Sequence, residues 1–80
     1  IMAMQIDILT PEKSLYSGEV IAVQFPGVEG SFQVLTDHAP LVAALGAGQI
    51  IIETANGSES IDFPGGVVEV SKNILSVLAQ

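Results

Sequence analysis

The sequence predicts an all-β fold in which two sheets pack face to face. Apolar and polar residues alternate along short segments, which is the pattern of half-buried strands. Residues that favour turns interrupt the chain about every eight to twelve residues, a spacing typical of a sandwich or barrel. No stretch of about ten residues keeps the period of an amphipathic helix, so we expect no long helix. The chain is long enough for a single domain, residues 1–80.

Three segments of the first half alternate and are expected to be strands: residues 4–8, 21–25 and 31–35. Gly, Pro and Ser favour turns between them, at Thr10-Pro11, Ser17-Gly18 and Pro26-Gly27. Residues 41–45 (LVAAL) are apolar at every position. Because such a run needs cover on both faces, we expect another protein to cover one of them.

In the second half, alternation predicts strands within residues 50–52, 61–63, 68–70 and 75–79. Asn56-Gly57 is the strongest turn signal, because a type I′ hairpin turn needs positive φ at both central residues. The inward positions of the alternating segments predict a core of Ile6, Ile21, Val23, Phe32, Val34, Phe63, Val70 and Val77.

The composition of the chain excludes some classes of function. Nine carboxylates against two lysines give a net charge of −7, and nucleic-acid binding needs clustered basic residues, so it is excluded. Adhesion to an anionic membrane surface is disfavoured for the same reason. No apolar segment is long enough to span a bilayer, and the start of the chain lacks the basic region of a signal peptide. Ile1, ahead of Met2, is expected to precede the native start.

The chemistry of an enzyme is missing from the sequence. His38 is the only histidine, and its neighbour Asp37 would point away from it on an extended chain, so the two make a poor catalytic pair. Metal-ligand spacing and a phosphate-binding loop are also missing, so we expect no catalysis, no metal, no cofactor and no small-molecule ligand. His38 has two interpretations, a turn residue bonded to backbone or a contact at an interface.

The segment 30–41 (GSFQVLTDHAPL), followed by Gly48, resembles the epsilon subunit of bacterial F-type ATP synthase, the counterpart of the mitochondrial delta subunit. Residues 7–20 (DILTPEKSLYSGEV) are similar to the family's opening strand and turn. Residues 65–70 (GGVVEV) and 75–78 (LSVL) resemble its closing hairpin. The likeness is to the N-terminal β-sandwich domain and covers nearly the whole chain.

The resemblance implies a flattened β-sandwich of about ten short, mostly antiparallel strands. It implies a non-catalytic rotor-stalk subunit that couples the gamma subunit to the membrane rotor ring, for ATP synthesis driven by proton or sodium transport. By the same resemblance, His38, Ala39, Pro40, Leu41 and Val42 contact gamma, and Glu29, Gly30 and Ser31 contact the ring. The expected place is the cytoplasmic face of the bacterial inner membrane, peripherally bound within the complex.

Two further expectations accompany the resemblance. Family members usually continue into a C-terminal helical hairpin, which we expect to be absent here because the chain stops at Gln80. An alternative function remains open, because Lys72 lies in a turn between two strands, as does the modified lysine of lipoyl and biotinyl carrier domains. The usual flanks of that lysine are missing, and an exposed turn lysine is the commoner explanation.

Overall fold

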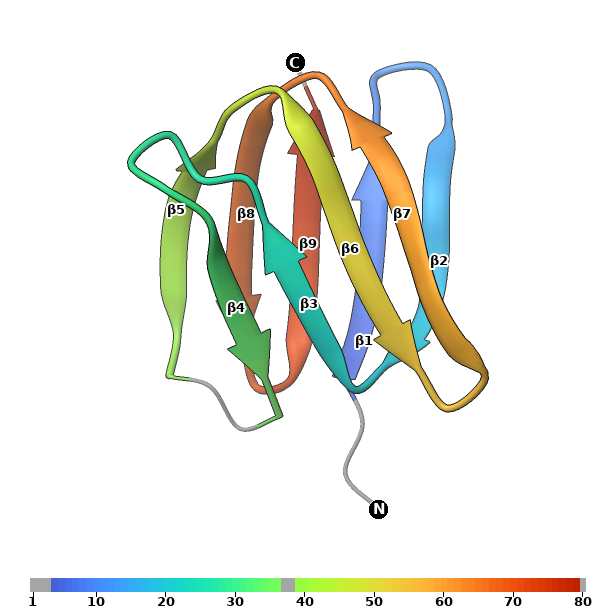
Figure 1. The fold of residues 1–80 in the computed structure, drawn as a ribbon. Coiled ribbons are helices and arrows are strands. Elements are labelled where there is room, and N and C mark those ends of the chain that lie inside the picture. The colour runs from blue at the N-terminus through green and yellow to red at the C-terminus, as the bar shows by residue number, and fades with distance from the viewer. Residues whose placement is uncertain (1–3, 37–38, 80) are drawn as a thin grey trace.

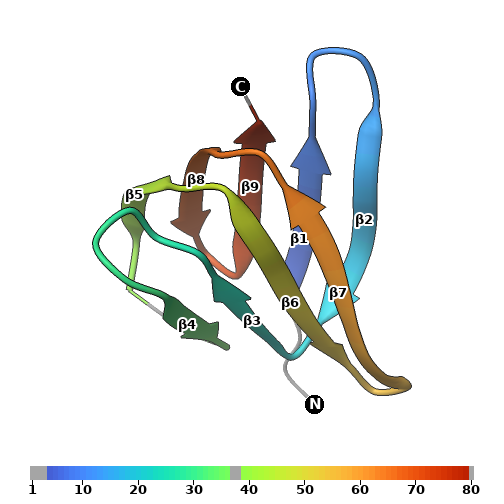
Figure 2. The ribbon, with the colours of Figure 1, turned by 45° about the horizontal axis from the view of Figure 1, so that its top comes forward.

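Nine strands in two packed sheets make up the part of the chain that the computed structural model describes, residues 4–36 and 39–79. One sheet has the strand order β2-β1-β9-β8-β5, and the other has the order β4-β3-β6-β7. The two layers face each other in Figure 1, and the turned view of Figure 2 separates them. The predicted β-sandwich is confirmed. The strands are β1 (Met4–Leu9), β2 (Ser14–Val20), β3 (Ala22–Phe25), β4 (Phe32–Leu35), β5 (Leu41–Leu45), β6 (Gly48–Thr54), β7 (Gly57–Phe63), β8 (Gly66–Ser71) and β9 (Ile74–Ala79).

The first and last of these strands lie side by side in the middle of the five-stranded sheet. β1 pairs with β9 in parallel, with Gln5 opposite Ile74 and Ile8 opposite Val77. The N–H of Gln5 also donates to the carbonyl of Asn73 at 2.9 Å. The other strand pairs of the described residues are antiparallel, as predicted.

Most of the predicted core is confirmed. The apolar side chains between the sheets form one buried cluster that draws on both layers. Phe32 is partly buried and packs against this cluster, with its ring centroid 5.5 Å from that of Phe25. Six other predicted members are buried: Ile6, Val23, Val34, Phe63, Val70 and Val77.

Ile21 was wrongly predicted to lie in the core, since its side chain is 39% exposed. The residue sits where the chain leaves β2 in one sheet and enters β3 in the other. Val20, the last residue of β2, faces inward, and both Ala22 and Val23 are buried after the crossing. Two consecutive buried residues break the period of two, so the alternation counted from Val23 gives the wrong face for Ile21. The N–H of Ile21 donates to the carbonyl of Glu53 at 2.8 Å and ties the crossing to β6.

The predicted turn at Ser17-Gly18 is also wrong, because both residues lie inside β2. Ser17 pairs with Asp7 and donates from its hydroxyl to the Asp7 carboxylate at 2.6 Å. Gly18 pairs with Ile6, and the ring of Tyr16 lies beside it. The strand escaped prediction because its inward face carries Tyr16, Gly18 and Val20, and the glycine beside Ser17 gives the sequence the pattern of a turn.

The type I′ geometry occurs at a different hairpin from the one predicted. Lys72 and Asn73, between β8 and β9, have φ values of 51° and 63°, which are positive at both central positions. In the β6–β7 hairpin, Thr54 pairs with Gly57, so Ala55 and Asn56 are the central residues. Gly57 has φ 129° but already belongs to β7, so Asn56-Gly57 does not form the predicted turn.

Neighbouring residues of β6 offer a direct test of the assigned faces. Ile52 is fully buried, whereas Ile51 is 38% exposed on the outside of the same strand. Ile52→Ala should lower the free energy of unfolding by about 2–5 kcal/mol because it leaves a cavity. Ile51→Ala should cost less than about 1 kcal/mol. Urea unfolding of both variants measures the difference, and equal losses would contradict the register of β6.

Candidate interaction surface

A tight glycine loop connects β3 to β4. Gly30 has φ 128°, a conformation that residues with a Cβ seldom adopt, and its N–H donates to the carbonyl of Gly27 at 3.1 Å. A Cβ at Gly27 would lie 2.6 Å from the Gly30 carbonyl oxygen and 3.0 Å from the Phe32 ring. Glycine at position 27 therefore lets the loop close over that ring.

This loop is bonded to the last part of β5. The N–H of Val28 donates to the carbonyl of Ala44 at 3.2 Å, and the N–H of Gly46 donates to the carbonyl of Pro26 at 2.7 Å. Together they form a short antiparallel bridge between Gly27 and Leu45. The bridge fixes the loop against one edge of the five-stranded sheet, although the loop belongs to the other sheet.

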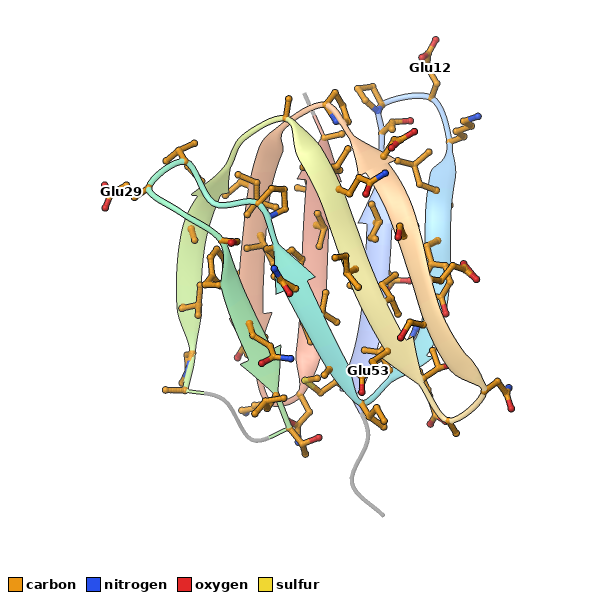
Figure 3. The ribbon with its side chains drawn as sticks, viewed as in Figure 1. Glu12, Glu29 and Glu53 are labelled. Carbon is orange, nitrogen blue, oxygen red and sulfur yellow. The ribbon has the colours of Figure 1, made fainter. Side chains whose placement is uncertain are left out.

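The residues predicted to meet the rotor ring are at the tip of this loop. Glu29, Gly30 and Ser31 are all exposed. Figure 3 shows Glu29 projecting away from the body of the sandwich, on the side where β4 and β5 lie. Its carboxylate is therefore open to a partner that approaches this end.

The residues predicted to meet gamma divide between the two faces of β5. Leu41 is partly buried and packs against the core, whereas Val42 is 70% exposed. Ala39 and Pro40 are exposed ahead of the strand, and His38 falls outside the described residues. The apolar run thus alternates after all, with residues 41, 43 and 45 turned inward and residues 42 and 44 turned outward. As expected, its outer face is left uncovered by the described chain.

Val42 lines two surface hollows, and both contain residues that were predicted to contact a partner. One has a volume of about 400 Å³ and is lined by Gly27, Val28, Glu29, Gly30, Phe32, Val42, Ala43 and Ala44. The other, of about 350 Å³, is lined by Pro40, Leu41, Val42, Glu69, Val70 and Ser71. The first hollow brings Glu29 and Gly30 together with Val42, so residues predicted to contact two different partners meet at one corner of the molecule. Ser31 is outside both linings.

A row of apolar side chains crosses the outer face of the five-stranded sheet. The strand register places Ala44 beside Val67, Val67 beside Leu78, and Leu78 beside Leu9. Val67, Leu78 and Leu9 are 37%, 50% and 39% exposed, and Ala44 is also exposed. This outer apolar row begins two residues from Val42 on β5, which makes the uncovered surface continuous.

The described residues show no sign of a metal site or of a buried polar site. Within residues 4–36 and 39–79, no group of three or more His, Cys, Asp or Glu residues could hold a metal ion. In the same ranges no polar or charged side chain is buried, and no helix is long and apolar enough to cross a membrane. Lys72 is exposed in the turn between β8 and β9.

Comparison with known proteins shows the family. Residues 3–80 match the family model described as "ATP synthase, Delta/Epsilon chain, beta-sandwich domain". The chain belongs to this family. That membership confirms the resemblance seen in the sequence and leaves the carrier-domain alternative at Lys72 without support.

Curated relatives carry the same family name at substantial identity. The chain is 43% identical to the ATP synthase epsilon chain of Leptospira borgpetersenii over 75 residues, 94% of this chain and 59% of that one. It is 48% identical to ATP synthase epsilon chain 1 of Nitrobacter hamburgensis over 73 residues, 91% of this chain and 54% of that one. The corresponding chain of Chlorobium limicola is 43% identical over 79 residues, and 98% of this chain matches 90% of it. The chain thus spans little more than half of the first two relatives.

Solved structures confirm the fold. A chain of the Euglena gracilis mitochondrial ATP synthase, described as OSCP/F1/c-ring, superposes with a TM-score of 0.90 at 18% identity, over 99% of this chain and 51% of that one. A chain of the Tetrahymena thermophila mitochondrial ATP synthase, described as central stalk/c-ring, superposes with a TM-score of 0.80 at 20% identity, over 96% of this chain and 63% of that one. At these identities the likeness establishes the architecture alone.

Two members of the surface escaped sequence reasoning. Val28 is 63% exposed and lines the first hollow, and Glu69 lines the second. A long-range strand pairing places Glu69 opposite Val42. Val28 carried a usable signal, because it is an apolar residue inside a turn of Gly and Glu, where nothing local could bury it.

Packing of the loop over Phe32 can be tested with glycine substitutions. Gly27→Ala should destabilise the fold by about 1–3 kcal/mol, because its Cβ would meet both backbone and an aromatic ring. Gly18→Ala is the matched control, since its nearest neighbour would be the Tyr16 hydroxyl at 3.6 Å, and it should be neutral or slightly stabilising. Thermal unfolding of both variants provides the comparison. A Gly27→Ala protein as stable as the wild type would contradict the tight loop.

Proposed function

We propose that this chain acts as a non-catalytic subunit of the rotor stalk of ATP synthase. Its role is to couple the gamma subunit to the membrane rotor ring, so that rotation driven by proton or sodium transport reaches the catalytic head. Family membership supports this role, as do relatives named as epsilon chains and fold neighbours in assemblies described as central stalk and c-ring. In a bacterium the assembly would lie at the cytoplasmic face of the inner membrane, where the chain is bound peripherally.

The observation that carries the proposal is the shared hollow at the corner of β5 and the glycine loop. The gamma-facing set comprises His38, Ala39, Pro40, Leu41 and Val42, and the ring-facing set comprises Glu29, Gly30 and Ser31. Val42, Glu29 and Gly30 line the same hollow, so gamma and the ring would approach each other at this corner. A small rigid domain that holds two partners at adjacent surfaces can transmit torque between them.

The chemistry of the two sets suits their different partners. Val42 is apolar, strongly exposed and continuous with the outer apolar row, which fits a protein surface that excludes water. The loop tip offers one carboxylate and exposed backbone, which fits polar loops at a wet interface. The function therefore needs no cofactor and no small-molecule ligand.

A pull-down with purified gamma subunit and rotor ring tests the proposal. The chain should bind gamma, and it should retain the ring when both partners are present. Failure to retain either component would refute the proposed role.

Val42 is the residue on which the gamma contact can be tested most cleanly. Val42→Asp should weaken gamma binding at least tenfold, because it places an unpaired charge in a desolvated contact. The sandwich should stay folded, since the Val42 side chain is 70% exposed in the free chain. Leu41 is unsuitable for this test because it packs against the core.

Ile51→Asp is the matched control, since Ile51 is exposed on the outer face of the other sheet. It should bind gamma like the wild type. Isothermal titration calorimetry with gamma gives the affinities, and circular dichroism confirms the folds. If folded Val42→Asp bound gamma with unchanged affinity, the contact would lie elsewhere.

A further inference from the structure

β5 differs from the edge strands β2 and β7 in the chemistry that it leaves exposed. The fourth edge strand, β4, also lacks charged residues but exposes the polar Gln33. The exposed residues of β7 include Glu59 and Asp62, and those of β2 include Ser17 and Glu19. Charged residues on an edge strand discourage pairing with another chain. Every residue of β5 is apolar. An apolar edge strand without charged residues is open to an added strand wherever no loop covers it.

Backbone alternation shows which groups of β5 are available. β5 pairs with β8 along one side, and on its other side the Ala44 carbonyl accepts from Val28. Alternate residues of a strand direct their N–H and C=O groups to the same side, so those of Val42 point the same way as those of Ala44. Among the described residues, no backbone group pairs with Val42 on that side.

The first hollow lies beside this unpaired stretch. Its volume of about 400 Å³ is far larger than the roughly 30 Å³ share of one water molecule, so it has room for side chains. The Phe32 ring, Val42 and Ala43 provide apolar walls, and Glu29 is the one charged residue of its described lining. An extended segment lying along Val42 would therefore direct an apolar side chain into the hollow.

We propose that the gamma subunit binds by adding a short extended segment to the free edge of β5 at Val42, with one apolar side chain of that segment seated against Phe32. The inference rests on the proposed function and specifies how gamma is held. The glycine loop already occupies the edge at Ala44, so the added segment is confined to about three residues beside Pro40–Val42. Backbone bonds would supply affinity, and the hollow would select the side chain.

The negative charges of the two hollows indicate which residues should flank the apolar side chain of that segment. Glu29 lines the first hollow and Glu69 lines the second, and both are exposed. Neither Lys13 nor Lys72 is part of either described lining. The segment of gamma that binds here should therefore carry an apolar residue flanked by Lys or Arg, and its association should weaken as salt rises.

Amide hydrogen exchange of the unmodified chain tests the added strand. The Val42 amide should exchange rapidly in the free chain and at least tenfold more slowly when purified gamma is bound. A Val42 amide that still exchanges rapidly in the gamma complex would overturn strand addition while leaving the proposed function intact. Protection that grows with the concentration of the chain alone would show that a second copy occupies the edge, which also overturns the proposal.

A pair of variants separates the backbone from the side chain. Val42→Ala keeps the N–H and removes only methyl groups, whereas Val42→Pro removes the N–H at an edge position where proline is tolerated. Gamma should bind Val42→Pro at least tenfold more weakly than Val42→Ala, with circular dichroism confirming that both are folded. Equal affinities would overturn strand addition alone. Absence of gamma binding by the wild-type chain would overturn the proposed function together with this inference.

Discussion

The parallel pairing of β1 with β9 is the contact on which the rest of the structure depends. It joins the first strand of the described chain to the last, in the centre of the five-stranded sheet. β5 reaches that sheet only through β8, and β8 reaches β1 only through β9. Without this pairing the layer would separate into the β1–β2 hairpin and the β9-β8-β5 group. The pairing between opposite ends of the described chain therefore joins the strands around Val42 to the rest of their sheet.

Such a closure is costly in entropy, because it joins segments separated by nearly the whole chain. Burial of Ile6 and Ile8 from β1 together with Leu75 and Val77 from β9 offsets that cost, since all four side chains are fully buried. The described chain contains no buried polar or charged side chain that would weaken this core. The high apolar content of the sequence thus serves both the closure and the exposed surface.

The fold class and most strands could be predicted because alternation records which side of a strand is buried. Alternation failed to predict the structure at a crossing between sheets, in one edge strand and in one turn. Ile21 lies at the crossing between sheets, where Ala22 and Val23 are both buried, and a local pattern cannot show which sheet a residue faces. β2 was missed because Gly18 stands on its inward face between Tyr16 and Val20, and Ser17-Gly18 has the local pattern of a turn. The turn at Lys72-Asn73 was predicted, but its type I′ geometry was assigned to Asn56-Gly57 instead, because glycine content does not show which two residues the strand pairing leaves in the turn.

The candidate surface could be predicted in its parts but not in its arrangement. The apolar run 41–45 indicated that something must cover it, and the glycine turn indicated an exposed loop. That Leu41 faces inward while Val42 faces outward depends on the pairing of β5 with β8. That Glu29 and Val42 share one hollow depends on the bridge from the loop to β5, which unites two sheets. Both relations are tertiary, and no local sequence pattern encodes them.

Cysteine cross-linking in the assembled enzyme tests most directly whether one corner of this domain meets two partners. The chain contains no cysteine, so each single substitution gives this chain one thiol at a known position. A short-armed cross-linker should join Val42→Cys to gamma and Glu29→Cys to the rotor ring, while Ile51→Cys on the opposite sheet joins neither. Mass spectrometry of the adducts identifies each partner. Adducts from Ile51→Cys, with none from Val42→Cys and Glu29→Cys, would place the partners on the other face and contradict the account.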